Sequence, residues 1–151
     1  MPAAAEFVSI VTTALVAGVF WGPWLGLSRS MATFEPEVFL AIVHRMNRNL
    51  AGPMTVLMPL CLAWTVAVLL LSYGTGPRFL LALAALVAEV VAVIVTMAVE
   101  VPIVKTIATW TFPTLPTDWK NHRDRWLSFH LIRVAAGLTA LVLLVAMVTF
   151  W

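Results

Sequence analysis

The residues of this sequence that could do acid–base chemistry gather in one segment near its C-terminus. The segment Asp118–Gly137 reads DWKNHRDRWLSFHLIRVAAG and concentrates charged, imidazole and indole side chains. At 100° per residue, one helical face of about 80° holds most of them. On this face lie Trp119, His122, Trp126, His130, Arg133 and Gly137. Imidazole exchanges protons near neutral pH and guanidinium stabilises negative charge, so this face could support acid–base chemistry.

The composition indicates that this face enters a membrane. The chain has 151 residues, of which 62% are hydrophobic and 11% are charged, whereas soluble domains average about 25% charged residues. We therefore expect one integral membrane domain over residues 1–151. A net charge of +2 does not indicate nucleic-acid binding, and the single cysteine excludes an internal disulfide. No basic segment precedes the first apolar run, so we expect that run to be retained.

Four apolar stretches are long enough to cross the bilayer, which takes about 20 residues. They are Phe7–Leu27, Ala51–Tyr73, Phe79 to about Val101, and about Leu127 to Trp151. The fourth follows the acid–base segment without a break, which predicts one long helix that extends past the membrane. The predicted fold class is all-α, an integral membrane four-helix bundle that lies in the lipid bilayer.

The connections between these spans differ in character. Glu35–Asn49 reads EPEVFLAIVHRMNRN and has a proline suited to a helix start, followed by apolar residues at helical spacing. It is predicted to be a short amphipathic helix lying at the membrane interface. Pro102–Pro116 is expected to be longer and partly irregular. Pro59 is expected to kink the second span.

Lysine and arginine are distributed unevenly over the connections. The connection between spans two and three carries one basic residue, Arg78. The connections after spans one and three, which lie on the other side of the membrane, carry Arg29, Arg45, Arg48, Lys105, Lys120, Arg123 and Arg125. The positive-inside rule therefore predicts that both termini are extracytoplasmic and that the two long connections are cytoplasmic.

Depth in the membrane relates the acid–base face to an acidic residue of the third span. Counted from the span ends, Glu100, His130 and Arg133 lie at the same level, near the inner edge of the hydrocarbon. Glu89 precedes Glu100 by eleven residues, which places it on the same helix face and about 16 Å deeper. Charged side chains in a bilayer face the bundle interior because lipid exposure is costly. We therefore predict a polar pocket at the cytoplasmic end of the bundle.

Further side chains are predicted to line this pocket and bind a substrate. They are Trp21, Trp126, Asn47, Asn49, Trp119 and His122. A purely structural interpretation stays open for several of these groups. Glu100 and Arg133 could form an ion pair that only locks two helices, and Glu89 could be protonated and hydrogen-bonded. Trp119 could be an interfacial anchor and His122 could be solvated at the surface.

Two stretches of the C-terminal half resemble the anthrone oxygenase-like family of small membrane proteins. They are VEVPIVKTIATW and PTDWKNHRDRWLSFHLIRVAAGLTAL. The family pattern is an acidic residue, a tryptophan and then D-W-x-x-x-R-x-R-W-x-x-x-H-x-x-R. It corresponds here to Glu100, Trp110, Asp118, Trp119, Arg123, Arg125, Trp126, His130 and Arg133. The N-terminal half matches mainly in layout, with Asn47 and Asn49 in the region of an Asn-bearing segment.

The resemblance implies four spans and an oxygenase activity, since fungal members are associated with oxidation of anthrones to anthraquinones in polyketide pathways. That oxidation needs deprotonation beside a carbonyl, stabilisation of the enolate, and dioxygen, and it needs neither metal nor flavin. His130, oriented by Glu100, is the expected base. Arg133 or an asparagine amide is the expected oxyanion partner. Trp21 and Trp126 are expected to sandwich a flat aromatic or quinone-like substrate, with no cofactor predicted.

Two other interpretations remain open at the level of sequence. A metal- or haem-dependent oxidoreductase could use Glu89, Glu100, His122 or His130 as ligands, although Glu89 and Glu100 are too far apart to share one metal and the chain lacks the Glu-x-x-His pairs of di-iron bundles. A haem with two histidine ligands would have to use His44 and His130. A non-enzymatic transporter or quinone-binding protein could use Glu89 as a protonatable site near mid-membrane. That transporter would have to form a homo-oligomer to enclose a path.

Overall fold

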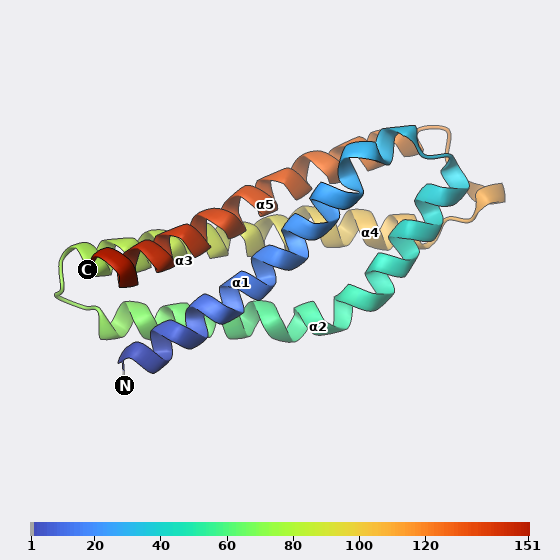
Figure 1. Ribbon diagram of the computed structural model, residues 1–151. Helices are drawn as coiled ribbons and strands as arrows, with labels where there is room; N and C mark the ends of the chain where they lie inside the picture. The colour runs from blue at the N-terminus through green and yellow to red at the C-terminus, as the bar shows by residue number, and fades with distance from the viewer. Residues whose placement is uncertain (1) are drawn as a thin grey trace.

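Helices form the regular structure of the computed structural model, which describes residues 2–151. Figure 1 shows long helices that run side by side, with both termini at the same end. The elements in order are α1 (Pro2–Gly26), the 3-10 helix η1 (Ser28–Thr33), α2 (Pro36–Leu71), α3 (Pro77–Val95), the π-helical turn η2 (Thr96–Glu100), α4 (Val101–Ala108), the 3-10 turn η3 (Phe112–Thr114) and α5 (Trp119–Phe150).

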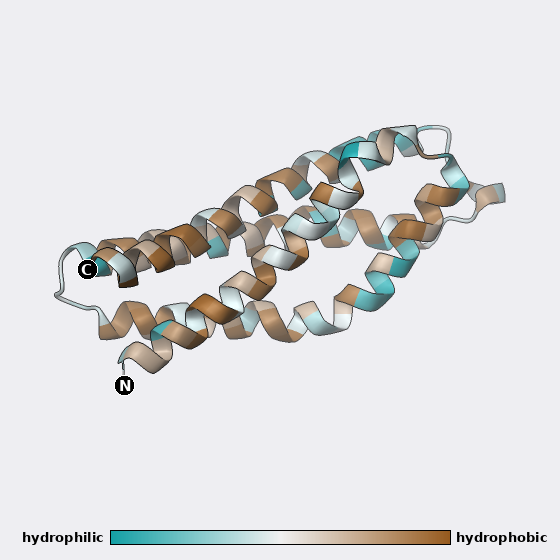
Figure 2. Cartoon of the chain, viewed as in Figure 1, coloured by the Kyte–Doolittle hydropathy of each residue, from teal (hydrophilic) through white to brown (hydrophobic). Residues whose placement is uncertain are grey.

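Four helical stretches are long and apolar enough to cross a membrane. They are Pro2–Thr33, Pro36–Leu71, Pro77–Ala108 and Trp119–Phe150. Figure 2 shows that apolar residues dominate their length, while much of the hydrophilic surface gathers where α1 ends and α2 and α5 begin. The prediction of an all-α, multi-pass membrane four-helix bundle is therefore confirmed. Which side of the membrane each end occupies remains a prediction from the distribution of basic residues.

The amphipathic segment Glu35–Asn49 is helical as predicted, but it is not a separate helix. It continues into the second span as one helix, α2, which contains both Pro53 and Pro59. A proline inside a helix removes one backbone hydrogen bond and bends the axis without ending the helix. Figure 1 shows the bend part-way along α2. The helix continues past both prolines because it keeps the other backbone groups of this apolar segment hydrogen-bonded.

The third span is interrupted by a wide turn that the sequence analysis missed. In η2 the N–H of Val101 donates to the carbonyl of Thr96, one residue further back than in an α-helix. Pro102 follows directly, and in a regular helix its ring would crowd the carbonyl of Ala98. The wider turn relieves that clash, so the helix continues through α4 to Ala108. The first part of the segment expected to be irregular is therefore helical.

The long C-terminal helix is confirmed. α5 comprises 32 residues, which corresponds to about 48 Å and exceeds a hydrocarbon core of about 30 Å. Small buried residues let α5 approach its neighbours, as is common where membrane helices pack. They include Ala82, Ala85 and Ala92 on α3 and Ala136, Gly137 and Ala140 on α5. This close packing fixes the height of the polar part of α5 against α1 and α3.

We predict that Gly137→Leu destabilises the bundle by about 1–3 kcal/mol, because a larger side chain overfills a packed site. A Cβ atom on Gly137 would lie 3.3 Å from the Phe20 ring and 3.5 Å from the Ala17 Cα atom. Gly18→Leu is the matched control, since a Cβ atom there meets nothing within 4 Å. Thermal unfolding of both variants in detergent measures the difference. Equal melting temperatures would contradict the packing described here.

Candidate functional site

A cavity of about 520 Å³ lies between the first part of α2, the η2–α4 stretch and the polar part of α5. Most of its surface is apolar, and its polar groups come from several helices. Its lining residues are Val19, Phe20, Pro23, Val43, Met46, Asn47, Leu50, Ala51, Met54, Thr55, Met58, Thr96, Met97, Glu100, Val101, Val104, Lys105, Trp126, His130 and Arg133. A cavity of this size and character is typical of a small-molecule site.

The exposure of the lining residues shows where the cavity opens. The exposed residues belong to two helical stretches, α2 and the stretch from α3 to α4. They are Asn47, Ala51, Thr55, Met97 and Lys105. Trp126 and His130 of α5 are buried, and so is Glu100 at the end of η2. The cavity therefore opens between α2 and the third span and ends at α5.

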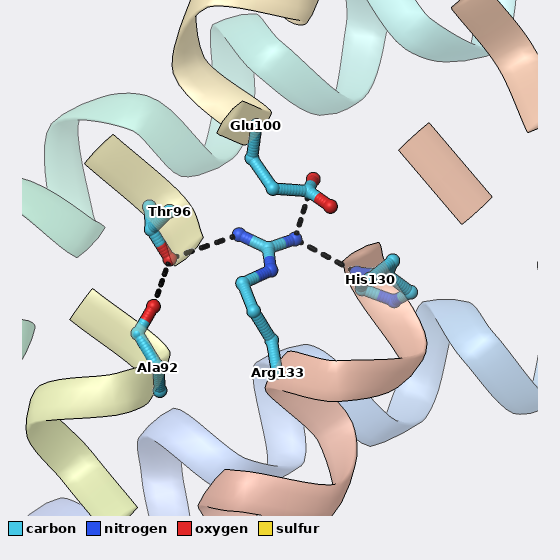
Figure 3. A network of polar contacts seen from close by, with 5 residues as sticks. All are labelled: Ala92, Thr96, Glu100, His130 and Arg133. Atoms are coloured by element: carbon cyan, nitrogen blue, oxygen red, sulfur yellow. Dashed lines mark hydrogen bonds and ion pairs between the residues drawn. The ribbon is translucent and has the colours of Figure 1, made fainter. Parts of the chain in front are cut away.

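Arg133 connects the polar groups at the closed end. Its Nη2 atom lies 3.0 Å from Oε2 of Glu100 and donates a 2.7 Å hydrogen bond to Nδ1 of His130. Its Nη1 atom donates a 3.4 Å hydrogen bond to Oγ1 of Thr96. Figure 3 shows the guanidinium between these three groups. Spans three and four are thus joined at the level that the depth estimate predicted for Glu100, His130 and Arg133.

The contact with Arg133 determines which nitrogen of His130 carries a proton. Guanidinium is only a donor, so Nδ1 of His130 must accept, and a neutral imidazole then carries its proton on Nε2. Nε2 is buried without a hydrogen-bond partner among residues 2–151, although the backbone of Phe20 lies near the ring. Trp126 stacks on the imidazole at 5.5 Å with an interplanar angle of 17°. His130 is therefore a fixed hydrogen-bond donor at the cavity wall.

Glu100 differs from the sequence expectation in its partner. It was expected to orient His130 directly, but Arg133 stands between the two. The two carboxylate oxygens of Glu100 accept no hydrogen bond of good geometry among the described residues, and the side chain is 2% exposed. Glu100 is thus held at the cavity by an ion pair and by no hydrogen bond of good geometry among residues 2–151.

Of the other predicted binding residues, Trp126 and Asn47 line the cavity. Trp21 does not. It is 39% exposed and packs against Trp24 at 5.0 Å, because it lies one position round α1 from the inward-facing Phe20. Asn49 is exposed and outside the lining, since it lies two residues from Asn47 and points about 200° away. The structure therefore places neither Trp21 nor Asn49 in the lining of this cavity.

Trp119 and His122 also lie outside the cavity lining. Trp119 is buried against Phe39 at 5.2 Å, with the guanidinium of Arg123 over its ring at 5.3 Å. His122 meets the edge of Trp110 at 5.1 Å. Both side chains lie two to three turns before His130 on α5, so they pack near the start of this helix. Trp119 is part of an apolar cluster there rather than an interfacial anchor.

Several residues that line the cavity were not among the predicted site residues. Phe20 contacts Arg133, whose guanidinium carbon lies 4.8 Å from the ring centroid. Thr96 orients Arg133, and its position one helical turn before Glu100 could have indicated this. Lys105 was counted only for topology. The methionines of the lining could not be predicted from the sequence, because methionine is a common apolar residue in the interior of helix bundles.

Glu89 lies in a separate polar cluster deeper in the bundle. Its Oε1 atom accepts hydrogen bonds from Thr13 at 2.8 Å, Thr65 at 2.9 Å and Cys61 at 3.2 Å. These donors belong to α1 and α2, so the carboxyl group joins three helices. Glu89 is absent from the lining of the large cavity. A protonatable transport role for it stays a prediction.

A metal site would need several ligands in one place. Among residues 2–151, no three His, Cys, Asp or Glu side chains gather in a way that could hold a metal ion. His44, which a haem would have required, donates from Nε2 to the carbonyl of Ile107 at 3.1 Å instead.

The sequence matches a known protein family over the region that contains most of these residues. The family model described as Anthrone oxygenase matches residues 39–143. This chain belongs to the anthrone oxygenase family. The matched region contains the whole cavity lining except Val19, Phe20 and Pro23. Neither a curated protein nor a solved structure matches the chain.

In this family member we predict that Arg133→Met destabilises the fold by about 3–5 kcal/mol, because it leaves the buried Glu100 carboxylate without its counter-ion. Adding Glu100→Gln removes that charge and should recover part of the loss. A double-mutant cycle measured by thermal unfolding in detergent reports the coupling. If the stability loss of the double variant equals the sum of the losses of the two single variants, the 3.0 Å contact carries no interaction energy.

Proposed function

We propose that this protein is a membrane-embedded oxygenase that converts a flat, lipid-soluble aromatic ketone of the anthrone type into the quinone. The single observation behind the proposal is the Glu100–Arg133–His130 group at the closed end of an apolar cavity. Membership of the anthrone oxygenase family gives independent support. The substrate would reach the cavity from the bilayer, because the opening lies between two membrane-spanning helices.

The reaction needs no reductant besides its substrate. A base removes a proton from the methylene carbon conjugated with the ketone, which gives an enolate. The enolate transfers an electron to dioxygen, and the two radicals combine into a carbon–oxygen bond that is protonated to a hydroperoxide. Removal of the second proton from that carbon breaks the O–O bond and forms the new carbonyl. One ketone and one dioxygen thus give one quinone and one water.

The contacts favour Glu100 as the base. Nδ1 of His130 is occupied by Arg133 and Nε2 carries the proton, so His130 is a donor in this arrangement. The carboxylate of Glu100 has oxygens that lack hydrogen bonds and faces the cavity. This assignment replaces His130, which the sequence suggested as the base. A proton taken by Glu100 would later be returned to the departing oxygen as water.

His130 and Arg133 are suited to hold the enolate oxygen. The Nε2–H group has no hydrogen-bond partner in the described part of the chain, and the guanidinium places positive charge beside it. Donors that are fixed before the reaction stabilise developing negative charge without reorganising, and this effect is strong in an apolar cavity. Thr96 and Trp126 hold the two groups in place through a hydrogen bond and ring stacking.

The apolar part of the cavity would bind the rings. Methionine side chains adapt to flat ligands and contact aromatic rings through sulfur. Met46, Met54, Met58 and Met97 line the cavity. Dioxygen is itself apolar and concentrates in the bilayer interior. Ketone and dioxygen would therefore meet in a region from which bulk water is largely excluded, which favours a reactive enolate over its rapid reprotonation.

We predict that Glu100→Gln lowers kcat for anthrone oxidation about 10²–10⁴-fold, since that is the usual contribution of a positioned general base. The rate is measured by quinone absorbance in nanodiscs, after subtraction of the spontaneous oxidation. Deuterium at the methylene carbon should slow the wild-type protein and confirm that proton removal limits the rate.

Glu89→Gln is the matched control, because Glu89 is buried on the same helical stretch but lies outside the cavity lining. It should keep most of the activity. A Glu100→Gln protein that is folded and as active as the wild type would refute the assignment of the base. Loss of activity in Glu89→Gln but not in Glu100→Gln would indicate that the reaction uses the Glu89 cluster instead.

A second prediction concerns ring binding. Trp126→Leu should raise KM for anthrone about tenfold and also lower kcat, because the stacking partner of His130 is lost. Trp21→Leu serves as its control, since Trp21 lies outside the lining. Equal kinetic constants for the two variants would show that Trp126 takes no part in the site.

A further inference from the structure

The cavity lining has more positively charged than negatively charged side chains. Glu100 is the only acid in the lining, and it is paired with Arg133 at 3.0 Å. Lys105 is a second cation of the lining, and no ion pair involves it among residues 2–151. With His130 neutral, the cavity carries one positive charge in excess. Low-dielectric walls concentrate such a field and attract anionic ligands.

Lys105 and Asn47 lie at the same opening. Both are exposed members of the lining, Lys105 on α4 and Asn47 on α2. A hydrogen bond from His44 to the carbonyl of Ile107 joins these two helices at 3.1 Å. That bond lies three residues from Asn47 and two from Lys105. Lys105 and Asn47 therefore belong to the parts of α4 and α2 that this bond joins, and both border the cavity.

We infer that Lys105 and Asn47 form a subsite for an acidic oxygen, a carboxylate or a phenolate, on the far end of the flat substrate. This inference rests on the proposed function. An ammonium group and a side-chain amide together offer several N–H donors to one anionic group. Lys105 follows Glu100 by five residues, about 7.5 Å along the helix axis. A fused-ring molecule is long enough to reach both groups.

The subsite would select which ketones are oxidised and set their orientation. An acidic oxygen held at the opening leaves the opposite edge of the ring system facing Glu100 and His130. Because Lys105 is exposed, water and salt screen its charge, so the preference is modest rather than absolute. The same donors would also suit the phosphate of a lipid headgroup, and the experiment must separate these two sources.

The test compares two ligands that cannot be oxidised further. The dissociation constants of anthraquinone and anthraquinone-2-carboxylate are measured by tryptophan fluorescence quenching in phosphatidylcholine nanodiscs, with empty discs to correct for partitioning. The wild-type protein should bind the acid more tightly. Lys105→Met should reduce the ratio of the two constants about tenfold, Asn47→Leu should reduce it less, and Lys105→Arg should retain it.

Arg48→Met is the matched control, since Arg48 is exposed on α2 but absent from the lining. It should leave the ratio unchanged. An equal ratio in the wild type and a folded Lys105→Met protein would overturn the inference. In a second set of discs that contain phosphatidylglycerol, a Lys105→Met protein that binds less of this lipid while keeping the ratio would also overturn the inference, because Lys105 would then hold a headgroup. Neither ligand is turned over, so failure of the proposed oxidation would leave this result interpretable.

Discussion

A buried guanidinium is stable in a membrane bundle only when its charge is matched and its donors are used. The two terminal nitrogens of Arg133 meet this requirement through Glu100, His130 and Thr96, while its Nε atom has no partner among residues 2–151. These partners come from both the third and the fourth span, so the two spans cannot slide without breaking the network. The register of α5 against the third span is therefore set by electrostatics as well as by small residues. The same contacts fix the tautomer of His130 and leave Glu100 facing the cavity.

The cavity beside this network results from two irregularities in otherwise regular helices. The prolines within α2 bend its first part, and the π-helical turn before Pro102 carries Glu100. Regular helices with small residues pack closely, as α3 does against the C-terminal part of α5. The bend in α2 and the wide turn η2 thus open space at one end of the bundle, while the helices at the other end stay packed. Wide helical turns of this kind occur often at functional sites.

The two buried glutamates illustrate how surroundings separate similar side chains. Glu89 accepts hydrogen bonds from three donors and joins α1, α2 and α3. Glu100 has a single ion pair and borders a large cavity. A carboxyl oxygen that accepts three hydrogen bonds from two neighbouring helices is suited to holding those helices together. One with free acceptor positions beside a cavity is suited to exchanging protons with a ligand.

The sequence alone determined the four spans, the long C-terminal helix and the common level of Glu100, His130 and Arg133. Apolar length, helical spacing and the cost of lipid-exposed charge act locally, so they can be read along the chain. Only the tertiary structure decided that Phe20 rather than Trp21 faces the cavity, that Arg133 stands between Glu100 and His130, and that Lys105 borders the opening. These outcomes depend on helix rotation, on a bend and on a wide turn. A shift of one residue turns a side chain by 100°, and the polar spacing of a single helix cannot resolve that angle against its neighbours.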